Sequence, residues 1–253
     1  MHVNVAAAQL VTLLLVSTRI LAWMTMAPPV ATGGAPRTAK VILSIGLGLA
    51  IVPRAMAHAP AAEFLPMVAS LLEQVLIGAG LGMLTRVLFA AVESAGAFID
   101  MFGGFTAAAA YDPLSSASTS IFGKFYGILA TTLIFATNAH LMIFGGFLRT
   151  FDALPLDAAM SLARLDHALI NSVTTMFVDA LQIAGPLIVV LFISDMALGV
   201  LNRIAPQLNA FSMSFPIKIG LTLLLVGTSF IMMPQTVIQL ANRATQLVGT
   251  ITG

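Results

Sequence analysis

Charged side chains are too scarce in this sequence to give a folded globule a water-facing surface. Only 8% of the 253 residues are Asp, Glu, Lys or Arg, whereas 59% are hydrophobic. Soluble domains carry about 25% charged residues, because charge keeps their surfaces in water. The chain must therefore cover its apolar surface with lipid, with partner subunits, or with both. The composition predicts an integral membrane protein or a subunit of a membrane complex.

Apolar runs separated by helix breakers predict about six long hydrophobic helices arranged as hairpins, so the expected fold class is all-α. Residues 125–148 and 219–242 contain no Asp, Glu, Lys or Arg. Each run can cross a hydrocarbon core about 30 Å thick at about 1.5 Å per residue. No hydrophilic stretch is long enough for a soluble domain, which predicts a single helical domain over residues 1–253. The expected helices lie at roughly 5–26, 38–57, 65–100, 122–149, 168–201 and 212–248.

Several classes of function are disfavoured by the same composition. A net charge of +1 supplies no basic field for nucleic acid. Cysteine is absent, which removes disulfides and iron–sulfur ligation. The four histidines form neither an HExxH motif nor an i, i+4 pair, so a zinc site is unsupported. We therefore predict that the chain is no enzyme and needs no cofactor and no metal.

Three charged residues recur at a spacing of seven inside the third apolar run. Arg86, Glu93 and Asp100 share one stripe of a continuous helix, which drifts by about 20° per heptad. A charge at the centre of a membrane helix costs about 2.5–3.5 kcal/mol on insertion scales, and such groups almost always face protein or water. One interpretation is a buried polar seam that faces neighbouring helices or a conduit. The other is an interfacial helix with an ordinary wet face.

Small and polar residues inside the apolar runs also indicate contacts between helices. Gly78, Gly80 and Gly82 have the spacing that lets two helix backbones approach closely, although a glycine-rich membrane protein also produces such spacings by chance. Asn138 and His140 lie inside the fourth run. They fit either a proton relay or, more commonly, a hydrogen-bonded pair between helices.

The stretch "FGGFTAAAAYDPLSSASTS", residues 102–120, breaks the apolar pattern in a different way. Small side chains with a few aromatic ones suit a compact loop lodged against protein. Non-helical backbone at membrane depth survives only where protein or a water-filled cavity satisfies it. A channel plug and an ordinary surface hairpin are the two interpretations. The residues that we single out for the plug are Gly103, Gly104, Phe105, Tyr111, Asp112 and Pro113.

The stretch "LGVLNRIAPQLNAFSMSFPIKI", residues 198–219, places polar groups and a helix breaker between two very apolar runs. It resembles the signature region of the flagellar biosynthesis protein FliR family, which belongs to the FliR/SctT-like type III export gate subunits. That signature reads close to LG-[LV]-LNR-x-APQ-[LM]-N-x-F followed by a Phe-Pro step. Length and helix order are similar over essentially the whole chain. The matching residues, which we expect to serve assembly, are Asn202, Arg203, Pro206, Gln207, Asn209, Phe215, Pro216 and Lys218.

This resemblance implies a core subunit of the flagellar type III protein export apparatus, in the bacterial inner (cytoplasmic) membrane and the flagellar basal body. The implied partners are FliP-like and FliQ-like subunits, which complete a gated channel, together with an FlhB-like switch protein, membrane lipid and unfolded export substrates. The family's loop after the third helix plugs the closed channel, and it maps here onto about residues 103–118. The equivalent subunit of a virulence-type injectisome is the nearest alternative. A small-solute secondary transporter with broken helices is a more distant one.

Overall fold

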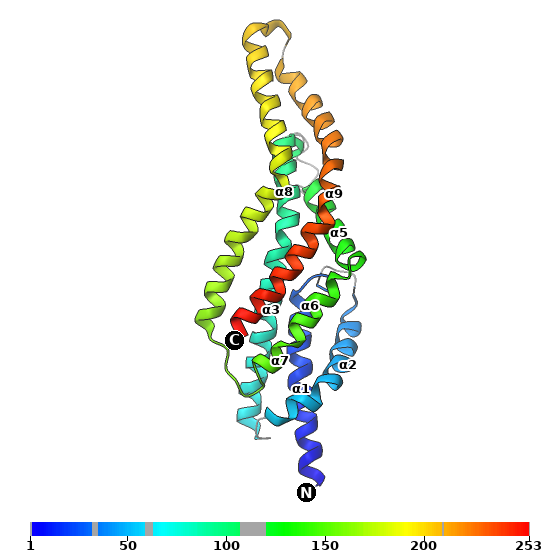
Figure 1. Ribbon diagram of the computed structural model, residues 1–253, viewed down its shortest axis with the longest axis vertical. Coiled ribbons are helices and arrows are strands. Elements are labelled where there is room, and N and C mark those ends of the chain that lie inside the picture. The colour runs from blue at the N-terminus through cyan, green and yellow to red at the C-terminus, as the bar shows by residue number, and fades with distance from the viewer. Residues whose placement is uncertain (1, 32–34, 59–62, 107–119, 209, 253) are drawn as a thin grey trace, which may run out of the picture. The chain divides into compact units, whose positions relative to one another are not determined.

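The computed structural model describes residues 2–31, 35–58, 63–106, 120–208 and 210–252. These residues are almost entirely helical and contain no strand, which confirms the all-α prediction. Two short 3-10 helices, η1 (Met56–His58) and η2 (Pro206–Leu208), accompany the α-helices. Figure 1 shows the α-helices in chain order: α1 (His2–Met26), α2 (Arg37–Ala55), α3 (Phe64–Gly103), α5 (Ile121–Ala136), α6 (Ala139–Leu148), α7 (Thr150–Ala153), α8 (Leu162–Ile204) and α9 (Ala210–Thr252).

The lengths of these helices suit a membrane. Within the part of the chain that the structure describes, five helices are long and apolar enough to cross one, and a sixth span results if the broken pair that begins with α5 is counted as one. Five of the six predicted segments are each one helix, within a few residues of the predicted bounds except at the start of α8. The prediction of about six long hydrophobic helices is therefore confirmed.

The fourth predicted helix, at residues 122–149, is wrong in one respect: it is interrupted. The helix α5 ends at Ala136 and α6 begins at Ala139, and between them Asn138 adopts a left-handed conformation with φ of 57° and ψ of 17°. Asn is one of the few residues that tolerates this conformation, because its short polar side chain can form local hydrogen bonds. The run around it has no charge, Pro or Gly at the break, so hydropathy alone could not reveal the interruption.

The chain groups into two compact units. Unit 1 contains Met1–Leu88, Thr137–Val173 and Gln239–Gly253, and unit 2 contains Phe89–Ala136 and Thr174–Ile238. Three long helices, α3, α8 and α9, contribute residues to both units. The single domain over residues 1–253 stays a prediction.

Close packing of α1 against α3 builds the core of unit 1. A Cβ added at Gly82 would lie 2.8 Å from the carbonyl oxygen of Trp23, and one at Gly78 would overlap the carbonyl oxygen of Arg19. Side chains larger than hydrogen would therefore push the two backbones apart, as the glycine spacing predicts. Trp23 is fully buried and stacks on Phe147 of α6, with ring centroids 4.4 Å apart.

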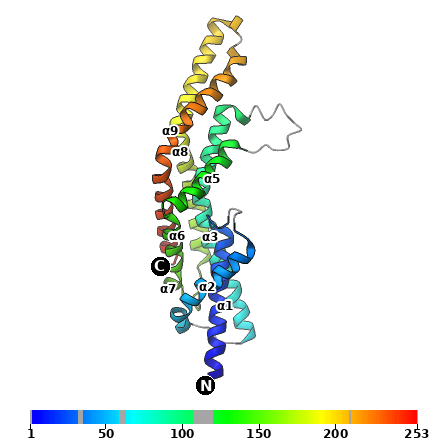
Figure 2. The same ribbon diagram turned by 90° about the vertical axis from the view of Figure 1, so that its right-hand side faces the viewer.

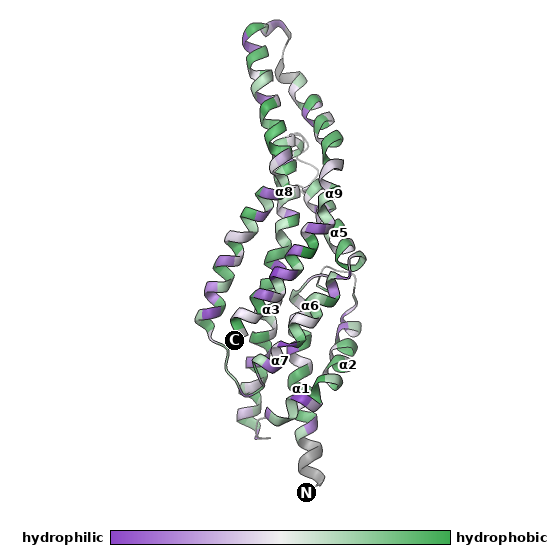
Figure 3. Ribbon diagram, in the orientation of Figure 1, coloured by the Kyte–Doolittle hydropathy of each residue, from purple (hydrophilic) through white to green (hydrophobic). Residues whose placement is uncertain are grey.

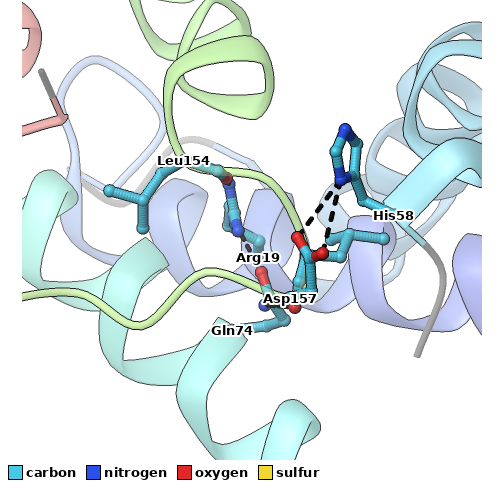
Figure 4. A network of polar contacts seen from close by, with 6 residues as sticks. Arg19, His58, Gln74, Leu154 and Asp157 are labelled. Carbon is cyan, nitrogen blue, oxygen red and sulfur yellow. Dashed lines mark hydrogen bonds and ion pairs between the residues drawn. The ribbon is translucent and has the colours of Figure 1, made fainter. Parts of the chain in front are cut away.

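A buried arginine ties three elements of unit 1 together (Figure 4). Arg19 has no exposed surface. Its Nε donates a 2.5 Å hydrogen bond to Oε1 of Gln74 on α3, and its Nη1 donates to the carbonyl oxygen of Leu154 at 2.8 Å. Its guanidinium carbon also lies 4.5 Å from the ring centroid of Phe151. Carbonyls at the end of a helix attract a cation, so Arg19 stabilises the chain directly after α7.

In unit 2, the parts of α8 and α9 that belong to it form an antiparallel hairpin around η2, and both views show them side by side (Figures 1 and 2). Pro206 begins η2 and ends the long α8, as expected of a residue that lacks the backbone N–H for a helical hydrogen bond. Elsewhere in unit 2 the Tyr126 hydroxyl lies 2.7 Å from Oγ of Ser229, which links α5 to α9.

Replacing Arg19 with Ala should destabilise the protein strongly, because Gln74 and the Leu154 carbonyl lose a charged partner inside the core. The expected loss is about 2–4 kcal/mol of unfolding free energy, which corresponds to a midpoint lower by roughly 5–15 °C for a chain of this size. The measurement is the temperature at which the tagged chain aggregates in a detergent extract. Arg164→Ala, at an exposed position of α8, is the control and should leave the midpoint unchanged.

Candidate functional site

The described part of the predicted plug loop lies at the end of α3, against α9. Gly103 and Gly104 are buried, and Gly104 has a φ of +84°, a conformation that favours glycine. A Cβ added at Gly104 would lie 3.3 Å from Cδ1 of Phe215. Phe105 meets Phe122 of α5 edge to face, with ring centroids 5.2 Å apart. Tyr111, Asp112 and Pro113 lie outside the described residues.

This arrangement brings together two regions that the sequence analysis treated separately. Gly104 belongs to the predicted plug, and Phe215 belongs to the predicted assembly motif, more than a hundred residues further along the chain. Both lie in unit 2 and touch where the chain leaves α3. The base of the loop is therefore positioned by the start of α9.

The three charges of the predicted seam have different surroundings. Asp100 is 1% exposed, and its Oδ2 accepts hydrogen bonds from the backbone N–H groups of Phe122 (3.0 Å) and Gly123 (3.3 Å) and from the hydroxyl of Ser120. Arg86 and Glu93 are exposed on this chain. A seam that faces neighbouring subunits stays a prediction, and within the chain Asp100 contacts the start of α5.

Ser120 is a residue of this region that the sequence analysis missed. Its Oγ accepts a 2.8 Å hydrogen bond from the N–H of Gly123, the third residue of α5. Ser is a preferred residue directly before a helix, because its side chain satisfies an amide of the first turn. The signal was present in the sequence: Ser120 is the last polar residue before the apolar run that starts at Ile121.

The motif residues at the turn between α8 and α9 are mostly on the outside. Asn202 and Arg203, in the last turn of α8, and Pro206 and Gln207, in η2, are exposed. Pro216, inside α9, is also exposed, whereas Phe215 is half-buried. Asn209 lies outside the described residues. Exposed polar residues at the turn, coloured purple in Figure 3, are groups that another molecule can contact.

Lys218 is the motif residue with a charged partner inside the chain. Its Nζ lies 2.6 Å from Oδ1 of Asp195, which joins α9 to α8. The Lys218 side chain is 15% exposed and the Asp195 side chain 38% exposed. Where lipid or another helix covers the hairpin, either charge alone would be left without a counter-charge.

Around this ion pair, the hairpin exposes large apolar side chains, and Figure 3 colours much of its ribbon as hydrophobic. Exposed apolar surface of this extent marks a region that contacts lipid or protein. The exposed residues of this kind in α8 and α9 include Val189, Phe192, Ile193, Met196, Val200, Ile204, Met213, Ile217, Leu223 and Leu224.

The fold and these surfaces define an all-helical membrane protein. The buried charges of Arg19 and Asp100 bind groups on its own helices, and its exposed helix surfaces carry large apolar side chains. The model of a family described as bacterial export proteins, family 1, matches residues 10–244. The chain belongs to this family.

Related proteins match most or part of the chain. The flagellar biosynthetic protein FliR of Escherichia coli (strain K12) is 32% identical over 209 residues, which are 81% of this chain and 80% of that protein. The FliR of Bacillus subtilis (strain 168) is 31% identical over 157 residues, 61% of each chain. The surface presentation of antigens protein SpaR of Salmonella typhimurium is 30% identical over 217 residues, 85% of this chain and 80% of that protein.

Exchanging the two charges of the ion pair tests whether Lys218 and Asp195 act on each other within the hairpin or contact another protein separately. Lys218→Asp and Asp195→Lys, each alone, place like charges together and should lower the amount of full-length chain in membranes several-fold. The double variant restores opposite charges and should recover most of that amount, measured by immunoblot. A double variant that is as poor as the single ones would show that each residue has a separate role.

Proposed function

We propose that this chain is the FliR-like subunit of the flagellar type III export apparatus. It lies in the bacterial inner membrane at the flagellar basal body, where it forms a gated channel with FliP-like and FliQ-like subunits. Unfolded export substrates pass through that channel, and an FlhB-like protein associates with it. The observation that supports this proposal most strongly is the family match over residues 10–244.

The distribution of polar and apolar side chains supports an assembly of this kind. The hairpin of α8 and α9 carries exposed side chains such as Leu224, which is 73% exposed. Partner helices or lipid would cover these side chains, because apolar surface removed from water gains about 25 cal/mol per Å². Arg86 and Glu93, exposed on this chain, would face polar groups of the same partners or the conduit.

The gating element in this proposal is the loop at about residues 103–118, which plugs the closed channel. Gly103, Gly104 and Phe105 form its base, and the bulky side chain expected further along it is Tyr111. The channel performs no bond chemistry of its own. The loop must move for an unfolded chain to pass, and small residues such as those at 107–110 let it pack without large side chains in the way.

An injectisome subunit is the second candidate, and the identity to SpaR over 85% of this chain favours it. Two observations favour the flagellar apparatus. The run "LNRIAPQLN", residues 201–209, matches the flagellar signature. Relatives in both Escherichia coli and Bacillus subtilis are named as flagellar. Membership of a family of export proteins disfavours the small-solute transporter.

Co-expression tests the assembly. The tagged chain, produced with FliP-like and FliQ-like proteins of the same bacterium, should purify as one large membrane complex and should be degraded when it is produced alone. Size-exclusion chromatography in mild detergent and immunoblotting give the readout. A stable monomer that ignores both partners would contradict the proposal.

Arg203→Ala refines this experiment, because Arg203 is exposed at the turn between α8 and α9. The variant should insert into membranes at the normal level and yield less complex. Arg54→Ala, an exposed arginine at the end of α2, serves as the matched control and should assemble normally.

Removal of the plug tests the gate. A Gly/Ser segment of equal length in place of residues 106–118 should let ions leak across the membrane of cells that also produce the partner subunits, since small flexible residues cannot fill the channel. Growth in high salt and the fluorescence of a membrane-potential dye measure the leak. The same replacement at residues 158–161, between α7 and α8, should cause none. Normal membrane potential in the first variant would rule out the plug.

A further inference from the structure

The junction between α3 and α5 is held by a single buried carboxylate. Asp100 of α3 accepts hydrogen bonds from Ser120 and from the first amides of α5, through its Oδ2 atom alone. Its second oxygen, Oδ1, is buried and has no hydrogen-bond partner among the described residues. The groups that bind Asp100 lie in the same unit as Asp100 itself.

The chemistry of this contact is that of a helix cap supplied by another helix. The first amides of a helix have no partner within it, and the helix dipole favours a negative charge at that end. A carboxylate that accepts backbone N–H groups forms charge-assisted hydrogen bonds, which are shorter and stronger than neutral ones. Because Asp100 is buried, separating it from α5 would leave a desolvated charge without its donors.

Close backbone packing reinforces the same junction. Gly96 lies one turn before Asp100, and a Cβ added there would approach the carbonyl carbon of Phe122 to 2.5 Å and the nitrogen of Gly123 to 2.7 Å. The ring of Phe105 also packs on Phe122. Phe122, near the start of α5, therefore packs against both Gly96 of α3 and Phe105, just after α3.

We infer that Asp100 is a positioning residue that keeps the start of α5 bound to the end of α3 throughout export. Its charge serves this junction within the chain, in place of a contact with partner helices or the conduit. The inference rests on the proposed function, because it assigns a role during export. Asp100 acts through Ser120, Phe122 and Gly123, which are the groups that it holds.

Export by a bacterium that lacks its own FliR-like subunit and produces this chain with its matching partners tests the inference. Asp100→Ala should reduce the secretion of flagellar proteins about tenfold or more, because it removes the charged acceptor of all three hydrogen bonds at the junction. Asp100→Asn retains an acceptor oxygen and should fall between Asp100→Ala and wild type. Asp166→Asn, which changes an exposed carboxylate on α8, should export normally.

A chemical cross-link distinguishes positioning from a general loss of stability. The chain has no cysteine, so Asp100→Cys with Ser120→Cys creates its only pair of thiols. A short bis-methanethiosulfonate, which forms a disulfide with each thiol and releases methanesulfinate, should bridge this pair and raise export above that of the untreated double variant, because the bridge replaces the lost contact. The same reagent on Ser120→Cys alone, which offers a single thiol, should give no gain.

Two results would overturn the inference: Asp100→Ala that exports like wild type, or a bridged pair that exports less than the untreated one. The latter would mean that the junction must open. A wild-type chain that fails to restore export would instead refute the proposed function, so the two failures can be told apart.

Discussion

Two buried charges among the described residues, Arg19 and Asp100, bind backbone groups at the ends of the chain's own helices. Arg19 is fully buried and donates to backbone carbonyls at both ends of the short α7, those of Thr150 and Leu154. Asp100 is buried and accepts from amides at the start of α5. The binding partners match each charge: carbonyl oxygens accept from the guanidinium of Arg19, and amides donate to the carboxylate of Asp100. Interrupted helices in an apolar chain are stable where such groups complete the backbone hydrogen bonding.

The outer surface, by contrast, exposes large apolar side chains. Side chains such as Ile42 on α2 and Leu224 on α9 are 71% and 73% exposed. The ion pair between Lys218 and Asp195 links α9 to α8 within this apolar hairpin. Little of this surface can be left in water, given that 8% of the residues are charged. The family to which the chain belongs is one of export proteins, and a subunit enclosed by lipid and other subunits meets that requirement.

Hydropathy was sufficient to predict the helices, because a run of apolar residues bounded by Pro and Gly leaves few alternatives. It could not predict the break at Asn138, which depends on one residue's tolerance of positive φ. Nor could it predict the Arg19 network, whose partners are more than fifty residues away on other helices or are backbone carbonyls, and backbone carbonyls leave no trace in the sequence. The spacing of Arg86, Glu93 and Asp100 indicated a common stripe, but the partners of each depend on which helix packs where.

A polar residue in an apolar helix therefore has two possible roles that sequence alone does not separate. It can satisfy the fold of its own chain, or it can be kept for another molecule. Burial in the single chain distinguishes them: Arg19, Gln74 and Asp100 are buried and bonded within the chain, whereas Arg86, Glu93 and Arg203 are exposed. Keeping an exposed charge beside apolar side chains costs free energy in a membrane unless another polar group meets it. The exposed charges are thus the positions where partner subunits have most to contribute.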